Sequence, residues 1–336
     1  MAATIQPERI LHELSELWVS LGKQNGHDST GVLRACAMTL VVVADAQEDA
    51  ASVGETLALL MREHPSRAVV VRVRDSVEPE LEARVFAQCW MPFGQRRQIC
   101  CEQIEISTSN SSLADVPAVV LPLVVADLPV ILWFRPPRLL ASPALQGLAR
   151  IATKTIIDST IFVDARTALE RLSRAAASGT LLGDLAWTRL TRWRELIAQI
   201  FENPVYSSHL PSIGAVTIYH SEATPTVGVW YMAAWLQLCL ERAGSKPRVR
   251  WERSGEAGDG GLSRVEFSTT DPAALTASVR KVEASAAEVR VNSLANRTVF
   301  PEASDYVLLR EELSIPGRDP IFESSLALAA SLIEKS

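Results

Sequence analysis

The residues of this chain that could perform chemistry are few. Cys100 and Cys101 are adjacent, and neighbouring thiols could serve as a redox pair because a thiol can exchange with a disulfide. Packing is the alternative interpretation, since successive side chains of a strand point to opposite faces of its sheet. That alternation predicts one thiol in the core and the other half-exposed.

Cofactor and metal motifs are missing from the sequence. Neither G-x-G-x-x-G nor G-x-x-x-x-G-K-[ST] occurs, so the glycines that let backbone amides approach a phosphate are absent. The histidines form no H-E-x-x-H pair, and His220-Ser221-Glu222 matches only half of a zinc deaminase signature, without the P-C-x-x-C half. We therefore expect no cofactor and no metal, and we assign no catalytic residue.

His64, Ser66 and Arg67 lie where a helix is predicted to end and a buried strand to begin. Arg67 and Ser66 could hold an anionic group or a carboxylate of a partner, because a guanidinium binds carboxylates through paired hydrogen bonds. In the alternative interpretation, His64-Pro65 ends the helix and Arg67 pairs locally.

The segment 184–201 has the most unusual composition. Its residues Trp193, Leu196, Ile197, Ile200 and Phe201 recur at helical spacing, which predicts that this stripe packs in the core. Arginines beside indoles, in contrast, are typical of interface anchors. The predicted partner-binding residues are Trp187, Arg189, Arg192, Trp193 and Arg194. Alternatively, the arginines pair with Asp184, Glu195 and Glu202 across a domain junction.

Composition limits the class of protein that could hold these residues. The chain has 336 residues, 48% hydrophobic and 21% charged, which favours a folded globular protein of one or two domains. Its net charge of −6 is the wrong sign for binding phosphate backbones, so we expect no nucleic-acid partner. The most apolar stretch, 116–134, is interrupted by prolines and Asp127, so we expect no membrane span. Five cysteines and no signal-peptide pattern predict a reducing, cytoplasmic location.

The hydrophobic patterns predict two α/β halves. In the first half, short β-branched runs predict buried strands, and helices are expected around them. The strands are expected at 39–44, 68–73, 84–90, 99–107, 130–134 and 155–159, and helices at 8–21, around 53–61, 142–151 and 165–177. That order favours a mixed sheet packed with helices.

The second half begins again with a strand at 215–220 and an apolar helix at 227–242. Cleanly alternating strands follow, with Val249, Trp251, Val265 and Phe267 on one face, so this half has α+β character and a half-solvated sheet. Two helices, at 302–313 and 320–333, close the chain. We therefore predict an N-terminal domain at 1–180, a helical connector at 181–204 and a C-terminal domain at 205–336.

Several segments carry a resemblance to a known family. HPSRAVVVRV (64–73), DLPVILWFR (127–135), TIIDS (155–159), DLAWTRLTRWRELIAQIF (184–201) and GRDPIFESSLALAASLI (317–333) resemble the OpcA-type glucose-6-phosphate dehydrogenase assembly proteins. The resemblance extends from about residue 30 to 333, and its most specific block is W-x-R-L-x-x-W-R-E-L. The matching motif positions are His64, Ser66, Arg67, Asp127, Trp133, Asp158, Trp187, Arg189, Trp193, Arg194 and Glu195. Arg192 stands where the family commonly has proline.

The resemblance implies a two-domain α/β protein without catalytic activity that binds glucose-6-phosphate dehydrogenase and promotes its assembly or active state. Two other functions stay open. One is a sugar-phosphate enzyme of the lactonase or isomerase type, for which Asp158, Arg67 and Ser66 are the available cluster. The other is a sugar-phosphate sensor.

Overall fold

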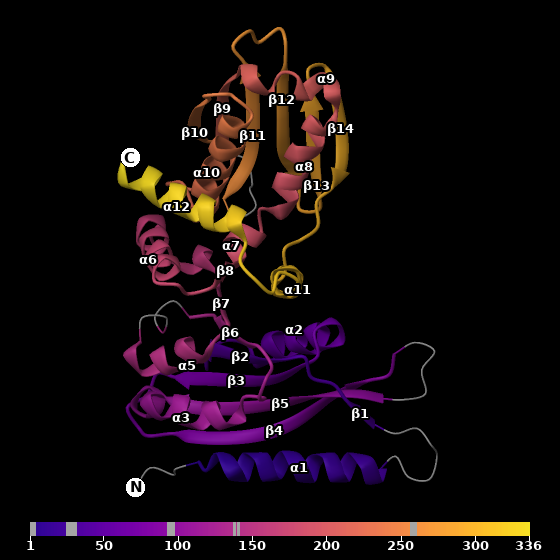
Figure 1. Ribbon diagram of the computed structural model, residues 1–336, viewed down its shortest axis with the longest axis vertical. Helices are drawn as coiled ribbons and strands as arrows, with labels where there is room; N and C mark the ends of the chain where they lie inside the picture. Colours follow the sequence, from indigo (N-terminus) through magenta and orange to yellow (C-terminus); the bar gives the residue numbers. More distant parts are fainter. Residues whose placement is uncertain (1–4, 25–31, 93–97, 137–138, 140–141, 256–260) are drawn as a thin grey trace. The chain divides into compact units, whose positions relative to one another are not determined.

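The computed structural model describes residues 5–24, 32–92, 98–136, 139, 142–255 and 261–336 (Figure 1). The chain forms two compact units, residues 1–157 and 158–336. The sequence placed the first domain boundary near 180 and a connector at 181–204. In the structure, the segment 181–204 lies within the second unit and contributes to its core.

The first unit is built on a mixed sheet with the strand order β1–β5–β3–β2–β6–β7, and β4 pairs with β5. All pairs are parallel except β4 with β5. The β-branched runs become fully buried strands because both faces of the sheet are covered. The strands are β1 (Val32–Arg34), β2 (Met38–Asp45), β3 (Ser66–Arg74), β4 (Leu81–Trp90), β5 (Gln98–Ser109), β6 (Val130–Phe134) and β7 (Lys154–Ile157).

Helices flank this sheet. In α1, Ile10 and Leu14 are buried, as the amphipathic pattern predicts, and the helix contacts β4. The carboxylate of Asp49 accepts from the N–H of Ala51 at the start of α2, and the N–H of His64 donates to Leu60 O at its end. The helices are α1 (Pro7–Gln24), α2 (Ala50–Glu63), α3 (Val116–Val120) and α5 (Gln146–Ile151).

The cysteine prediction was wrong in one respect. Cys100 and Cys101 both lie in β5 and both are fully buried, because this strand is covered on its two faces. Cys100 forms a disulfide with Cys89, which lies directly opposite it on β4. Cys101 is a free thiol, and its burial raises its pKa to about 11.

The second unit has a sheet with the strand order β10–β9–β11–β12–β13–β14. β10 is parallel to β9, and the other pairs are antiparallel. Its strands are β9 (Ile213–His220), β10 (Arg248–Arg253), β11 (Leu262–Thr269), β12 (Thr276–Glu283), β13 (Ala286–Val291) and β14 (Leu294–Val299). A further short strand, β8 (Leu182–Asp184), precedes the first helix of the signature segment.

One face of this sheet carries helices (Figure 1). Phe201 of α8 contacts Phe267 of β11, and Trp230 of α10 contacts Trp251 of β10. The helices of the unit are α6 (Ala165–Ala177), α7 (Leu185–Thr188), α8 (Thr191–Glu202), α9 (Pro204–Ser207), α10 (Val227–Arg242), α11 (Asp305–Leu313) and α12 (Pro320–Glu334).

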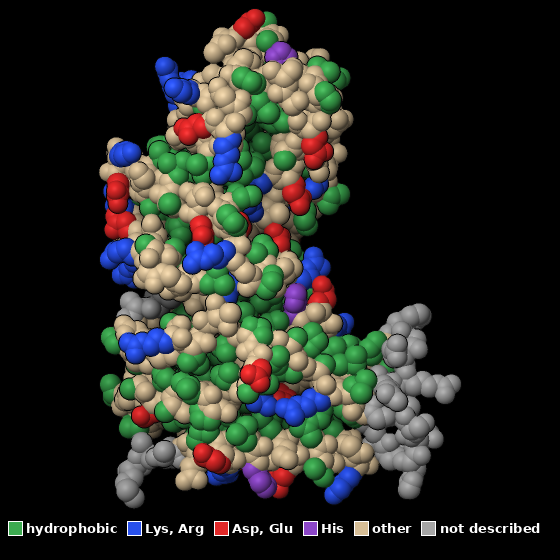
Figure 2. Space-filling model, in the orientation of Figure 1, with side chains coloured by type: hydrophobic (Ala, Val, Ile, Leu, Met, Phe, Trp, Pro, Cys, Tyr) green, Lys and Arg blue, Asp and Glu red, His purple; other side chains and the backbone are tan. Residues whose placement is uncertain are grey.

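The predicted fold class is confirmed: each unit is a mixed sheet packed with helices, and the second unit has the expected antiparallel strands. Within the described residues, none of the helices combines the length and apolar character needed to cross a bilayer. Acidic and basic side chains are interspersed over the visible face rather than gathered by sign (Figure 2).

Candidate functional site

The signature segment 184–201 forms the centre of the second unit. Asp184 caps α7: its Oδ1 accepts from the N–H of Ala186 at 3.0 Å and from the N–H of Ser159 at 2.9 Å. Its Oδ2 accepts from the Tyr231 hydroxyl of α10 at 2.8 Å. Asp184 is only 1% exposed, and these three donors belong to its own chain. One carboxylate thus joins three parts of the unit.

Burial controls the titration of this site. It raises the pKa of Asp184 to about 6, although hydrogen bonds to the carboxylate oppose the rise. The pKa of Tyr231 is also raised, first by burial and then by the neighbouring Asp184. The Asp184 carboxylate can take up a proton near neutral pH, but hydrogen-bond donors of the same chain already occupy both of its oxygens. Its chemistry is structural: it fixes α7 and α10 to each other.

A second buried carboxylate completes the cluster. Glu312 of α11 is 5% exposed and accepts from the Thr188 hydroxyl at 2.7 Å. Gly183 leaves room for it, because a β-carbon there would lie 2.3 Å from Glu312 Oε1. A side chain at position 183 would therefore displace Glu312.

The predicted indoles are buried. Trp187 is 3% exposed, packs with Tyr231 and Phe322 at ring distances of 5.8 and 5.9 Å, and donates from Nε1 to Asp319 Oδ2 at 3.2 Å. Trp193 is fully buried and meets Phe300 edge to face at 5.4 Å. Both rings act in the core of the second unit.

The predicted arginines are half-buried and bonded within the same unit. Arg189 donates to Asp158 Oδ2 and to Ala303 O, each at 3.1 Å. Arg192 donates to Val299 O at 3.1 Å and to Glu195 Oε2 at 3.1 Å. Of the carboxylates named in the alternative interpretation, Asp184, Glu195 and Glu202, only Glu195 is met by these two arginines. Arg189 meets Asp158 instead, and both contacts lie within the second unit rather than across a domain junction.

Arg194 is held differently. Its guanidinium carbon lies 3.7 Å from the Trp187 ring centroid, and Nη2 donates to Thr191 Oγ1 at 2.7 Å. Burial lowers the pKa of Arg194 to about 10, and the charges of Asp319, Glu311 and Glu312 oppose that fall. The cation therefore offsets the acidic side chains around the cluster.

The second predicted site lies in the first unit. Arg67 is 8% exposed at the start of β3, and it donates to Glu102 Oε2 at 2.6 Å and to Leu123 O at 2.8 Å. Glu102 also binds Arg34 at 2.7 Å and accepts from Trp18 Nε1 at 2.5 Å. The anion that meets Arg67 is thus a buried carboxylate of its own chain. Ser66 is buried beside it and His64 is half-buried. This geometry favours the interpretation that Arg67 pairs within its own chain, although its partners are distant in the sequence.

Sequence reasoning missed Tyr231, Glu312 and Glu102. A usable signal existed for Tyr231, since a single hydroxyl in a nearly all-apolar helix needs a buried partner. No comparable signal marks Glu312 or Glu102, whose partners come from distant parts of the sequence.

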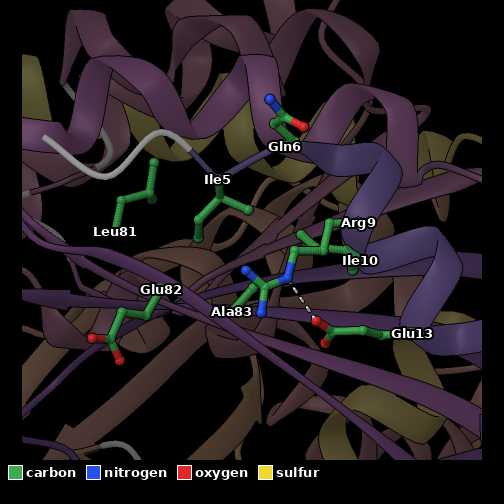
Figure 3. Close-up of a pocket in the computed structure, with 8 residues that line it drawn as sticks. All are labelled: Ile5, Gln6, Arg9, Ile10, Glu13, Leu81, Glu82 and Ala83. Carbon is green, nitrogen blue, oxygen red and sulfur yellow. Dashed lines mark hydrogen bonds and ion pairs between the residues drawn. The ribbon is translucent and has the colours of Figure 1, made fainter.

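Of two hollows, one lies away from these clusters, and the other borders the Asp184 cluster through Ser159. One, of about 380 Å³, lies between α1 and the start of β4, where Arg9 pairs with Glu13 at 3.0 Å (Figure 3). The Arg9 guanidinium and the Glu13 carboxylate are therefore already paired with each other. The other, of about 540 Å³, is lined by Ser159, Thr160, Phe162, Glu222 and their neighbours. Glu222 is the only charged side chain among its described lining residues, so this hollow does not favour a phosphate.

The comparisons with known proteins decide the family. A model described as the glucose-6-phosphate dehydrogenase subunit N-terminal domain matches residues 58–174, and one described as the corresponding C-terminal domain matches residues 180–326. Together they cover most of the chain. The chain belongs to the OpcA glucose-6-phosphate dehydrogenase assembly family. The expected resemblance is therefore confirmed, and every residue of the α7–α8 signature block lies within the C-terminal match.

Curated relatives agree. A protein of Nostoc punctiforme that carries the name OxPP cycle protein OpcA is 29% identical over 68% of this OpcA-family chain and 46% of its own length. Its namesake in Synechococcus elongatus is 27% identical over 63% of this chain and 46% of its own length. The chain thus spans about half the length of these curated relatives.

Solved structures give a weaker likeness. A 3-ketoreductase from Actinomadura kijaniata has a TM-score of 0.49 and 13% identity, with 88% of this chain and 96% of that chain covered. A dehydrogenase from Chromobacterium violaceum has a TM-score of 0.48 and 10% identity, with 89% and 94% covered. Structural similarity at these TM-scores and identities gives no information about the activity of an OpcA-family chain.

Proposed function

We propose that this chain is a non-enzymatic assembly factor that binds glucose-6-phosphate dehydrogenase and favours its active oligomeric or conformational state, in the oxidative pentose phosphate pathway and in the cytoplasm. The observation that carries the proposal is the pair of family matches, since both are described as parts of a glucose-6-phosphate dehydrogenase subunit. The names of the relatives, which place them in the OxPP cycle, support it.

The site geometry is consistent with a binding role. Asp184 and Glu312, the buried acids of the signature segment, accept hydrogen bonds from their own chain. In the cluster nominated for a sugar-phosphate enzyme, Arg67 is bonded to Glu102 and Asp158 to Arg189. Both charged members of that cluster therefore have other partners.

An assembly factor acts through differential affinity. A protein that binds the active state of a partner more tightly than the inactive state shifts the equilibrium by that ratio, and a tenfold ratio corresponds to about 1.4 kcal/mol. The second unit suits this role because the signature segment packs in its core, so the unit would present its surface without reordering.

The test is a titration of purified cognate dehydrogenase with this chain, with velocity and sedimentation measured on the same samples. We expect a saturable change in velocity, a heavier sedimenting species, and no turnover of sugar phosphates by the chain alone. If the dehydrogenase keeps its velocity and sedimentation at every concentration, the proposal fails. Turnover of a sugar phosphate or lactone by the pure chain would favour the enzyme alternative, and thermal stabilisation by a sugar phosphate alone would favour the sensor alternative.

A further inference from the structure

The sheet of the second unit has two unlike faces. Val216, Ile218, Val265 and Phe267 point to the face that carries α8 and α10, and all four are buried. Their neighbours Thr217, Tyr219, Arg264 and Glu266 point to the other face and are half-exposed. We call the latter the open face of the sheet.

Strand register places a band of charged residues on the open face, because residues directly opposite each other share a face. One row runs Glu252, Tyr219, Arg264, Arg280, Glu288 and Arg297, and the next runs Arg250, Thr217, Glu266, Ser278 and Arg290. Arg248 lies opposite Ala215 on the same face, and Glu283 pairs with Arg297.

The open face is net positive. It carries six arginines and, with Glu283 included, four glutamates, whereas the whole chain has a net charge of −6. All of the cations named are arginines, the residue type enriched in protein interfaces, whereas lysine is depleted there. Arg264 and Arg280 lie directly opposite each other on β11 and β12, which places two of these cations side by side on the face.

Part of this face is already ordered. Tyr219 donates from its hydroxyl to Glu266 at 3.0 Å, Arg264 binds Glu266 at 3.0 Å, and the Arg264 guanidinium lies 3.8 Å from the Tyr219 ring centroid. Side chains fixed before binding lose little conformational entropy on association. Tyrosine and arginine are also the residue types that most often dominate binding energy.

A hollow lies within the same face. It has a volume of about 290 Å³, and hydroxyl side chains, Glu266 and Arg290 line it. The hydroxyls belong to Thr217, Ser268, Thr276 and Ser278. A protruding polar side chain of a partner could enter here and find both donors and acceptors.

We propose that the open face docks an acidic surface of the dehydrogenase. This inference rests on the proposed function and adds the location and the charge of the contact. A second copy of the chain is a poorer occupant, because two net-positive faces would repel each other when apposed. The docking surface is therefore the open face rather than the signature segment, whose arginines are bonded internally.

The test reverses charge on either side of the hollow. Arg250 is exposed, and the Arg290 side chain is 56% exposed and pairs with Glu288, which is half-exposed. The variant Arg250→Glu/Arg290→Glu should weaken binding to the dehydrogenase at least tenfold at about 0.05 M salt, and the loss should shrink at about 0.5 M salt because the charges are screened. The control pair is the double variant Arg253→Glu/Arg174→Glu, which changes the net charge by the same amount. Arg253 lies on the same strand as Arg250 but on the opposite face, and Arg174 lies on α6.

The outcomes separate this inference from the proposed function. If wild-type chain does not bind the dehydrogenase, both fall. If wild type binds and the reversal variant binds equally well, or the control pair loses as much, only the location is overturned. If the wild-type chain forms a dimer and the reversal variant does not, the open face binds a second copy of the chain and the proposal is overturned. If the charge-reversal variant has a lowered melting temperature, Arg250→Gln/Arg290→Gln replaces it. We then expect a smaller loss of affinity for the dehydrogenase, which must still exceed the loss in the control pair.

Discussion

Replacing Asp184 by Asn should change how the stability of this protein depends on pH. In the wild type, burial raises the pKa of the Asp184 carboxyl from 3.8 to about 6. Asn has nearly the same shape and stays neutral. Its Oδ1 can accept from the N–H groups of Ser159 and Ala186, and its amide can donate to the Tyr231 oxygen if that hydroxyl turns.

The magnitude follows from linkage. The folded-state pKa lies above the unfolded-state value, so folding favours the protonated carboxyl. This contribution is fully present below about pH 3.8 and is lost as pH rises through about 6. Each pKa unit corresponds to about 1.4 kcal/mol, so the complete loss is about 3 kcal/mol. About 2 kcal/mol of it falls between about pH 4.5 and about pH 7.5.

The assay is urea unfolding of wild type and Asp184→Asn across that pH range. The other ionisable groups are common to both proteins, so the difference between the two curves isolates Asp184. We expect the variant to gain about 2 kcal/mol relative to wild type as pH rises. A constant difference between the proteins would refute the argument that the carboxyl is buried and proton-binding.

Asp164→Asn is the matched control. Asp164 is an exposed N-cap of α6, and hydrogen bonds from Thr167 lower the pKa of its carboxyl. The sign is therefore opposite: its contribution is present above the unfolded pKa and is lost as pH falls through the folded pKa. Between about pH 4.5 and about pH 7.5 the difference between wild type and Asp164→Asn should therefore stay nearly constant, whereas the Asp184→Asn difference changes.

Three further predictions rest on contacts in the structure. Trp193→Ala should cost about 3–5 kcal/mol of unfolding free energy, because the ring is fully buried against Phe300, and Trp193→Phe should cost less than half as much; equal losses in urea unfolding would contradict ring packing as the cause. Arg192→Ala should cost about 1 kcal/mol through its bonds to Val299 and Glu195 while leaving dehydrogenase activation unchanged, so weakened activation in the titration would return the partner surface to the signature segment that the sequence favoured. A thiol reagent should label the exposed Cys239 well before the buried Cys101, with Cys89 and Cys100 unreactive, and peptide mass spectrometry that finds Cys101 labelled first would contradict the burial of β5.

The sequence by itself determined the fold class, most elements and the family. Continuous apolar runs were sufficient to predict elements such as α10 and β2, because a long apolar run or a short β-branched run is stable only when buried. Three of the described strands escaped prediction. β1 and β8 have only three residues each. β14 carries Leu294, Ala295 and Asn296 in an exposed edge strand, where no burial imposes an alternating pattern.

Only the tertiary structure decided what the singled-out residues do. The arginines of the signature segment met backbone carbonyls at Val299 and Ala303, more than a hundred positions away, and Arg67 met Glu102. Periodicity indicates which face of an element is apolar, but it does not indicate which distant polar group lies opposite a given side chain. The pairing of residues across neighbouring strands gives that information, and it places Arg250, Arg264, Arg280 and Arg290 on one open face.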